Sequence, residues 1–126
     1  MLTAVSTFPT KDFVAEVARD FFERREHLVH EEADGLLEAR NPGTGEFWVV
    51  TCLGEVQTDE DFDSALGRLL KTMRPGNTKY GIAGPSLPAM HHHVSRIHPE
   101  IRDTLRLHYL IIDENGRIRT DTQYFD

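Results

Sequence analysis

The sequence predicts an α/β fold in which a small mixed β-sheet is flanked by helices. Its 126 residues are the length of one ordinary domain, and we expect a single domain over residues 1–126. Two segments, 11–29 and 58–73, repeat apolar side chains at helical spacing. Short apolar runs bounded by Gly, Pro or Asn lie between and after them, which is typical of buried strands. Helices interleaved with strands in this way favour an α/β sandwich.

The first part of the chain is predicted to form a helix followed by a β-hairpin. Thr10 can cap a helix over 11–29, whose apolar side chains form one stripe. Strands are predicted over 33–39 and 46–55, joined by the turn residues of 41–45. The second strand contains the run FWVVTCL, which is so apolar that we expect burial on both of its faces.

The second part of the chain is predicted to alternate helices with short strands. Thr58 and Asp61 resemble a capping box at the start of a helix that ends near Arg74. Turn and cap residues then divide the rest of the chain. We expect a strand over 79–83, a helix capped by Ser86, a short helix that begins at Pro99, a strand over 107–112, a turn at 113–116, an edge strand at 117–120 and a surface tail.

Composition argues against several classes of function. The net charge of −7, from 21 acidic and 14 basic residues, is unsuited to indiscriminate nucleic-acid binding, although it leaves room for a local basic patch. The single cysteine, Cys52, lies in an apolar run and is expected to be a core residue in a reducing compartment. No apolar stretch has the length of a signal peptide or a membrane span, so we expect a cytoplasmic protein with no membrane partner.

Five stretches of the sequence follow one another in an order that is found in a known family. Ala33-Asp34 precedes the run FWVVTCLGEV, which is followed by FDSALGRLLKTM, KYGIAGP and IHPEIRDTLRLHYLIIDENGRI. Together they resemble the core of the PD-(D/E)XK nuclease superfamily, the restriction-endonuclease-like fold, over nearly the whole chain. In that resemblance Ala33-Asp34 opens the hairpin, and FWVVTCLGEV is the strand that carries an acidic residue, any residue and then Lys.

The resemblance implies a site for metal-dependent cleavage of nucleic acid, but two of its residues are replaced. In the family, two carboxylates from adjacent strands hold a divalent cation, usually Mg²⁺, and a nearby Lys stabilises developing charge. Asp34 stands at the first carboxylate position, whereas Thr51 and Leu53 fall where the second carboxylate and the Lys would be. Alternate strand residues share a face, so both lie on an apolar face suited to packing. We therefore expect a degenerate member with no cofactor.

A site rebuilt from neighbouring elements is the alternative. Glu55 lies two positions beyond Leu53 and reaches the same face if the strand continues through Gly54. An acidic residue of the first helix, Glu16 or Glu23, would reach the edge of such a site. The alternative is an active Mg²⁺-dependent nuclease whose catalytic residues are Asp34, Glu55, Arg68 and Lys71, with Asp34 and Glu55 holding the metal.

The seven histidines of the chain do not favour a zinc site. His91, His92 and His93 are consecutive, and consecutive helical side chains point about 100° apart, so they do not converge on one metal. His27 and His30 are predicted near the end of the first helix, where positive charge suits the helix dipole.

We expect this chain to act without catalysis, as a degenerate nuclease-like module for binding, regulation or assembly. The acidic net charge favours a protein partner or self-association, as a homo-oligomer, over nucleic acid, with DNA as the other partner class. A third hypothesis keeps the α/β order without the family. It is an unrelated interaction subunit built around an apolar dimer seam, because fold resemblance by itself is a weak basis for function.

Overall fold

The computed structural model describes residues 7–56 and 58–120. In this part of the chain every strand belongs to one sheet of six strands, in the order β1-β2-β3-β4-β5-β6. The elements are α1 (Lys11–Arg24), β1 (Leu28–Ala33), β2 (Leu36–Arg40), β3 (Phe47–Cys52), α2 (Asp59–Thr72), β4 (Lys79–Pro85), α3 (Pro88–Ser95), α4 (Pro99–Leu105), β5 (Leu107–Ile112) and β6 (Ile118–Thr120).

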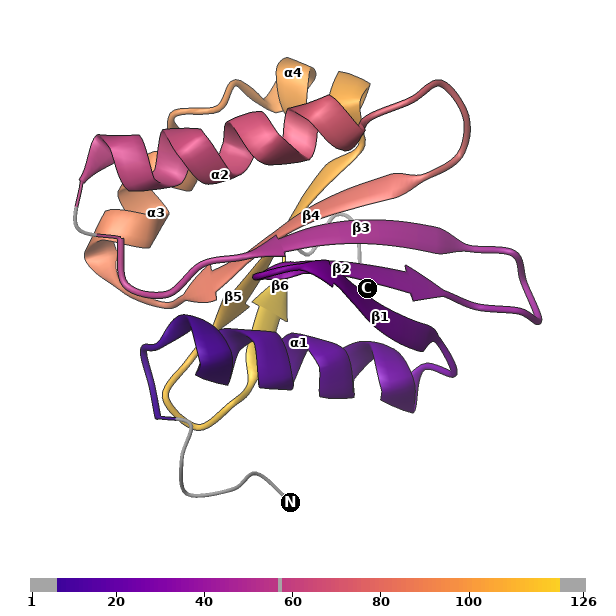
Figure 1. The fold of residues 1–126 in the computed structure, drawn as a ribbon. Helices are drawn as coiled ribbons and strands as arrows, with labels where there is room; N and C mark the ends of the chain where they lie inside the picture. The colour runs from indigo at the N-terminus through magenta and orange to yellow at the C-terminus, as the bar shows by residue number, and fades with distance from the viewer. Residues whose placement is uncertain (1–6, 57, 121–126) are drawn as a thin grey trace.

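The sheet is mixed, and helices cover both of its faces. Strands β1, β2 and β3 form an antiparallel meander, β3, β4 and β5 are parallel, and β6 runs antiparallel to β5. Figure 1 shows α1 on one face and α2, α3 and α4 on the other. The predicted class, a small mixed sheet flanked by helices, is confirmed. None of the helices in the described residues has the length and apolar character needed to cross a membrane.

The first helix is shorter than predicted, and the chain beyond it forms a strand that the sequence analysis missed. α1 ends at Arg24, and Glu26 takes a left-handed φ of 67°, which turns the chain out of the helix. His27 and His30 therefore do not lie at a helix end, because His27 precedes β1 and His30 lies on it. Leu28 repeats the helical spacing but is a 60% exposed residue of the edge strand β1.

The predicted hairpin is confirmed, with shifted bounds. The chain turns at Asp34-Gly35 rather than entering a strand at 33, and Gly35 adopts the φ of 78° that such a turn favours. β2 then begins at Leu36, which pairs with Thr51 of β3. The loop at 41–45 is closed by the side chain of Asn41, which accepts hydrogen bonds from two backbone N–H groups. β3 ends at Cys52, short of the predicted 55.

The core lies on both faces of the sheet, and β3 supplies both halves. Every residue of β3 except the half-buried Phe47 is buried, which confirms the prediction of burial on both faces. Burying one large apolar side chain contributes about 1.5–3 kcal/mol, so these two layers are the main source of stability. The α1 side contains Phe13, Val14, Val17, Ala18, Phe22, Leu37, Trp48, Val50, Leu110 and Ile112, and the α2 side contains Val49, Leu53, Phe62, Ala65, Leu69, Tyr80, Ile82, Met90, Leu107 and Tyr109.

The remaining elements follow the predicted order. The capping box of Thr58 and Asp61 is present at the start of α2. The predicted cap of the third helix is wrong, because α3 begins after Leu87 and the hydroxyl of Ser86 lies 3.1 Å from Nε2 of His91 instead. β5 and β6 form the expected hairpin around the turn at 113–116. The predicted surface tail, 121–126, lies outside the described residues.

Candidate functional site

Two hairpin residues, Thr51 and Leu53, lie in the core. In the family resemblance they are at the positions of the second carboxylate and the Lys. Thr51 is 2% exposed and Leu53 is 9% exposed. Both belong to the sheet face that α2 covers, and Leu53 packs in one cluster with Phe62 and Leu69 of α2. A divalent cation bound here would lose its hydration without gaining carboxylate ligands from these two positions. This end of β3 is therefore built for packing.

Asp34 lies at the rim of the same region, and its carboxylate is engaged by a lysine. Its Oδ2 accepts a hydrogen bond from Nζ of Lys11 at the start of α1, and the side chain is 78% exposed. The hydrogen bond and the charge of Lys11 lower the pKa of Asp34 below its ordinary value, burial opposes this, and the charge of Arg68 on α2 adds a smaller lowering. The structure thus pairs the Asp34 carboxylate with Lys11.

Glu55 does not lie on the strand as the rebuilt site requires. The strand was expected to continue through Gly54, but β3 ends at Cys52 and Glu55 follows as an exposed residue outside the sheet. The chain passes close to α1 at Gly54, where a Cβ would lie 2.6 Å from the backbone nitrogen of Lys11. The start of α1 therefore occupies the space beside the chain at the point where the strand ends.

The other residues of the rebuilt site lie on two helices. Arg68 and Lys71 are exposed on α2, and of the two only Arg68 is among the charges that lower the pKa of Asp34. On α1, Glu23 pairs with an arginine one turn earlier at 3.8 Å. Oε2 of Glu16 is buried and has no hydrogen-bond partner in residues 7–56 and 58–120. Across those residues, no three His, Cys, Asp or Glu side chains are grouped so as to hold a metal ion.

The histidines of the α3 region have separate partners. His93 is buried and stacks on Phe62 at 4.8 Å, in the core under α2. His91 faces the hydroxyl of Ser86, and His98 caps α4 by accepting a hydrogen bond from the N–H of the residue two positions later. Their different directions agree with the expectation that consecutive histidines do not share a metal.

A charged network that the sequence analysis missed lies at the opposite end of the hairpin. Oε1 of Glu46 is 2.9 Å from Nε2 of the buried His27, and Oε2 is 2.8 Å from Nζ of Lys79. Burial raises the pKa of Glu46, but hydrogen bonds from Lys79, Trp48 and His27 outweigh it and lower the pKa to about 2. His27 and Lys79 lie 19 and 33 residues from Glu46 in the chain, so a local sequence motif does not predict their contacts with it.

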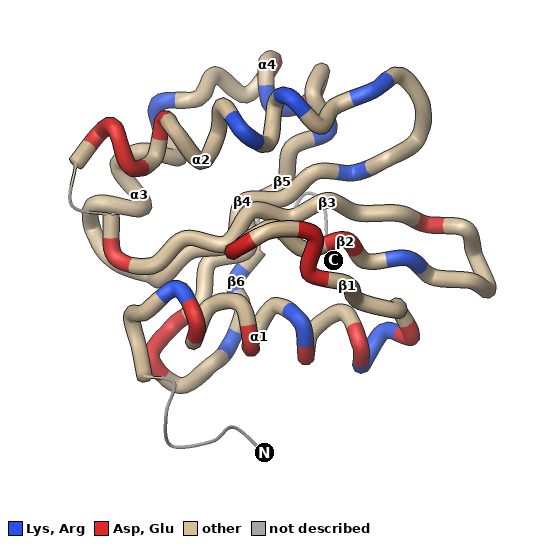
Figure 2. The backbone as a smooth tube through the Cα atoms, viewed as in Figure 1, with Lys and Arg blue, Asp and Glu red and all other residues tan. Residues whose placement is uncertain are grey.

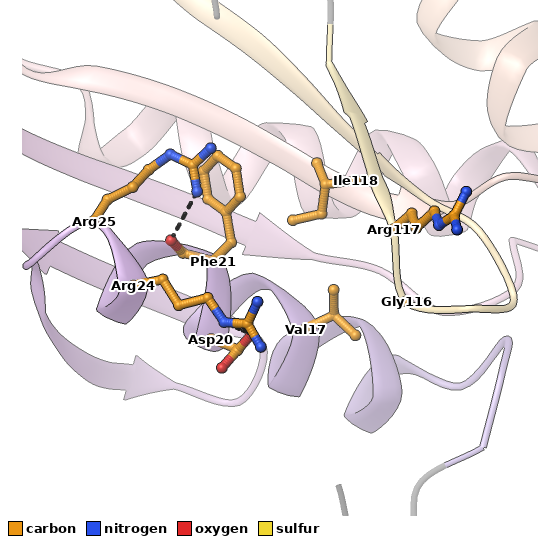
Figure 3. Close-up of a pocket in the computed structure, with 8 residues that line it drawn as sticks. All are labelled: Val17, Asp20, Phe21, Arg24, Arg25, Gly116, Arg117 and Ile118. Atoms are coloured by element: carbon orange, nitrogen blue, oxygen red, sulfur yellow. Dashed lines mark hydrogen bonds and ion pairs between the residues drawn. The ribbon is translucent and has the colours of Figure 1, made fainter. Parts of the chain in front are cut away.

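A hollow of about 450 Å³ lies between α1 and the β5–β6 hairpin (Figure 3). Its arginines are largely engaged by their own helix. Arg24 pairs with Asp20 at 2.9 Å, while Arg25 lies 3.7 Å over the ring of Phe21 and donates to the carbonyl of the same residue. Two of the three arginines that line the hollow are thus engaged by residues of α1, and the third is Arg117, between β5 and β6.

Comparisons with protein-family models, with curated proteins and with solved structures find no match to this chain. The geometry of the residues is therefore the basis for a function. At the hairpin, that geometry combines buried uncharged positions with one exposed, lysine-paired aspartate.

Proposed function

We propose that this chain is a catalytically degenerate domain of the PD-(D/E)XK, restriction-endonuclease-like type that serves as a binding, regulatory or assembly module. The order of helix, hairpin, helix and parallel strand supports the family part, because the resemblance depends on that order. The additional strand β1 precedes the hairpin. One observation carries the non-catalytic part. Thr51 and Leu53, at the positions of the second carboxylate and the Lys, are buried uncharged side chains.

The chemistry of the family explains why this observation matters. A metal-bound hydroxide needs a cation held by at least two oxygen ligands beside the phosphate. Asp34 offers one carboxylate, and a metal ion would have to displace Lys11 from it. Losing the second carboxylate and the Lys together removes both metal affinity and stabilisation of the transition state.

A protein is the partner class that the net charge favours. The −7 charge of the chain repels a polyanion over the distances at which unscreened charges act. DNA is the competing partner class, and it would have to bind a local basic surface. Salt titration separates the two, because binding to phosphate weakens steeply as salt concentration rises.

A cleavage assay tests the proposal. The purified chain is incubated with plasmid DNA and with single-stranded RNA in Mg²⁺ and then in Mn²⁺, beside the variant Asp34→Ala. We expect no cleavage by either protein and no Mg²⁺-dependent shift in the melting temperature. Metal-dependent cleavage that Asp34→Ala abolishes would establish the alternative, an active nuclease with relocated residues. Cleavage that survives the variant points to a contaminant and is resolved by repurification.

A further inference from the structure

Ser86 lies at the point where the middle parallel strand of the sheet ends. β4 pairs with β3 on one side and β5 on the other, both parallel to it, and Ser86 follows its last residue, Pro85. In α/β sheets, ligands bind outside the carboxyl ends of parallel strands. A turn from such a strand into a helix can also present a nucleophilic serine. The helix that follows Ser86 is α3, which begins at Pro88, so the topology places a hydroxyl at this edge of the sheet.

The hydroxyl of Ser86 has a histidine as its partner. Its Oγ lies 3.1 Å from Nε2 of His91, in the first half of α3. This distance is within the hydrogen-bond reach that joins a nucleophile to its general base. When Nε2 carries no proton, it accepts the hydrogen bond from the hydroxyl and can take up the proton as the oxygen attacks. Both residues are exposed, so a substrate can reach them.

The backbone around the pair is attached to the sheet and to the core. The N–H of Ser86 donates to the carbonyl of Ile112, at the end of β5, at 2.7 Å. The N–H of His91 donates to the carbonyl of Leu87 at 3.1 Å, which closes the first turn of α3. Met90, the residue before His91, is 1% exposed and packs in the core on the α2 side. Fixed backbone on both sides of the pair favours a constant separation of the two side chains.

A hollow beside Ser86 has the residues of an anion site. It has a volume of about 300 Å³, and its lining residues are Ser86, Ile111, Asp113, Arg117, Ile118 and Arg119. Oδ1 of Asp113, the one acid of this lining, accepts hydrogen bonds from two N–H groups of its own turn. Within the described part of the chain, Arg117 and Arg119 form no ion pair.

The charge of the two edges of the sheet agrees with this assignment. Figure 2 shows blue on β6 and red on β1, which are the two edge strands. Two arginines beside one aspartate that is bound to its own turn leave positive charge in the hollow, which attracts a carboxylate. Ser86 belongs both to this hollow and to the pair with His91, so a substrate held by the arginines would lie next to the hydroxyl.

We propose that Ser86 and His91 hydrolyse small esters whose acyl group carries a carboxylate. Oγ of Ser86 attacks the ester carbonyl carbon while its proton passes to Nε2 of His91. The bond to the alcohol oxygen breaks, the alcohol leaves with that proton, and the acyl group stays on Oγ. Water then attacks the acyl carbon, its proton passes through Nε2 to Oγ, and the free acid leaves. Arg119 pairs with the carboxylate of the acyl group. The inference goes beyond the proposed function and uses none of the nuclease-like positions.

The test uses two chromogenic esters that differ in charge, the mono-para-nitrophenyl ester of succinic acid and para-nitrophenyl acetate. Release of nitrophenolate is followed near neutral pH, and mass spectrometry of peptides locates the acyl group on the full chain. The variants are Ser86→Ala, His91→Gln and Arg119→Gln. The matched controls are Ser95→Ala and His92→Gln, because Ser95 is an exposed serine of the same helix whose hydroxyl donates to the backbone carbonyl of His92 and not to a histidine ring.

We expect the wild type and both controls to hydrolyse the succinate ester faster than the acetate and to carry the acyl group on Ser86. Ser86→Ala should lose this activity, and His91→Gln should be about a hundredfold slower. Arg119→Gln should remove the preference for the charged ester. All five substituted residues are exposed, so the variants are expected to melt with the wild type.

Three results would overturn the inference. They are the absence of hydrolysis by the wild type, hydrolysis that survives Ser86→Ala, and an unchanged rate in His91→Gln. An acyl group on a histidine or on Ser95 in place of Ser86 would also count against it, and equal rates for the two esters would reject the anionic acyl group. Each of these results leaves the nucleic-acid cleavage assay with Asp34→Ala unaffected, so this inference and the proposed function can fail separately.

Discussion

The two ends of the β2–β3 hairpin carry opposite chemistry. At the end where β3 meets α2, Thr51 and Leu53 are buried without charge. At the other end, Glu46 is held by His27 and Lys79 in a network partly shielded from water. The apolar end was predicted from the sequence, whereas the charged end was not.

The difference shows that clustered ionisable residues are by themselves a poor guide to catalysis. The Glu46 network joins the segment before β1, the start of β3 and the start of β4, so it ties together parts of the chain that are distant in sequence. Perturbed pKa values also arise in such structural ion pairs. The contrast can be tested by adding charge where it is missing and by removing it where it is present.

The largest effect is expected from adding a carboxylate at the apolar end. Thr51→Asp places an unpaired charge at a 2% exposed position, and we expect a loss of about 3–5 kcal/mol in the free energy of unfolding. Urea denaturation measures it, and Thr51→Val, which adds no charge, should lose far less stability than Thr51→Asp. A Thr51→Asp variant with wild-type stability would mean that this face is open to solvent or to a cation.

Removing the charge from the polar end should have a smaller effect. Glu46→Gln keeps the shape of the side chain but leaves Lys79 and His27 without their carboxylate, and we expect a loss of about 1–3 kcal/mol. Glu38→Gln on β2 is the matched control, a half-buried strand glutamate with no ion pair in the described residues. Equal midpoints for the two variants in urea would contradict the structural role of the network.

Lowering the pH should remove the stabilisation that Glu46 contributes, without a mutation. The pKa of Glu46 is about 2 in the folded chain against an ordinary value of 4.5, so its ionised form favours folding. The stabilisation is complete above about pH 4.5 and is lost as the pH falls toward about 2. We therefore expect the stability difference between the wild type and Glu46→Gln to shrink through that window. A difference that stays constant down to the acid limit would show that Glu46 is not the titrating group.

The smallest effect is expected at Asp34. Asp34→Asn weakens its pairing with Lys11, but the carboxylate is exposed, and exposed ion pairs add little to stability. The urea midpoint should be close to that of the wild type, with Asp12→Asn, another exposed acid of the same region, as the control. A loss as large as that of Glu46→Gln would give Asp34 a structural role that its exposure does not suggest.

Much of the fold could be predicted because local chemistry specifies it. The capping box at Thr58, the turn at 41–45 and the apolar run of β3 each depend on neighbouring residues, and all are present in the structure. β1 was missed because Leu28 repeats the spacing of α1, while its strand owes its form to pairing with β2. The end of β3 was misplaced because the apolar run continues to Leu53, whereas strand pairing with β2 and β4 stops at Cys52.

The sequence by itself determined the α/β class, the order of the elements apart from β1, and the apolar character of the Thr51 and Leu53 face, since periodicity and alternation are local properties. Only the tertiary structure decided which side chains meet. It placed Glu46 between His27 and Lys79 and paired Asp34 with Lys11. These contacts depend on how strands pair and helices cross. Because they join residues far apart in the chain, local sequence patterns do not predict them.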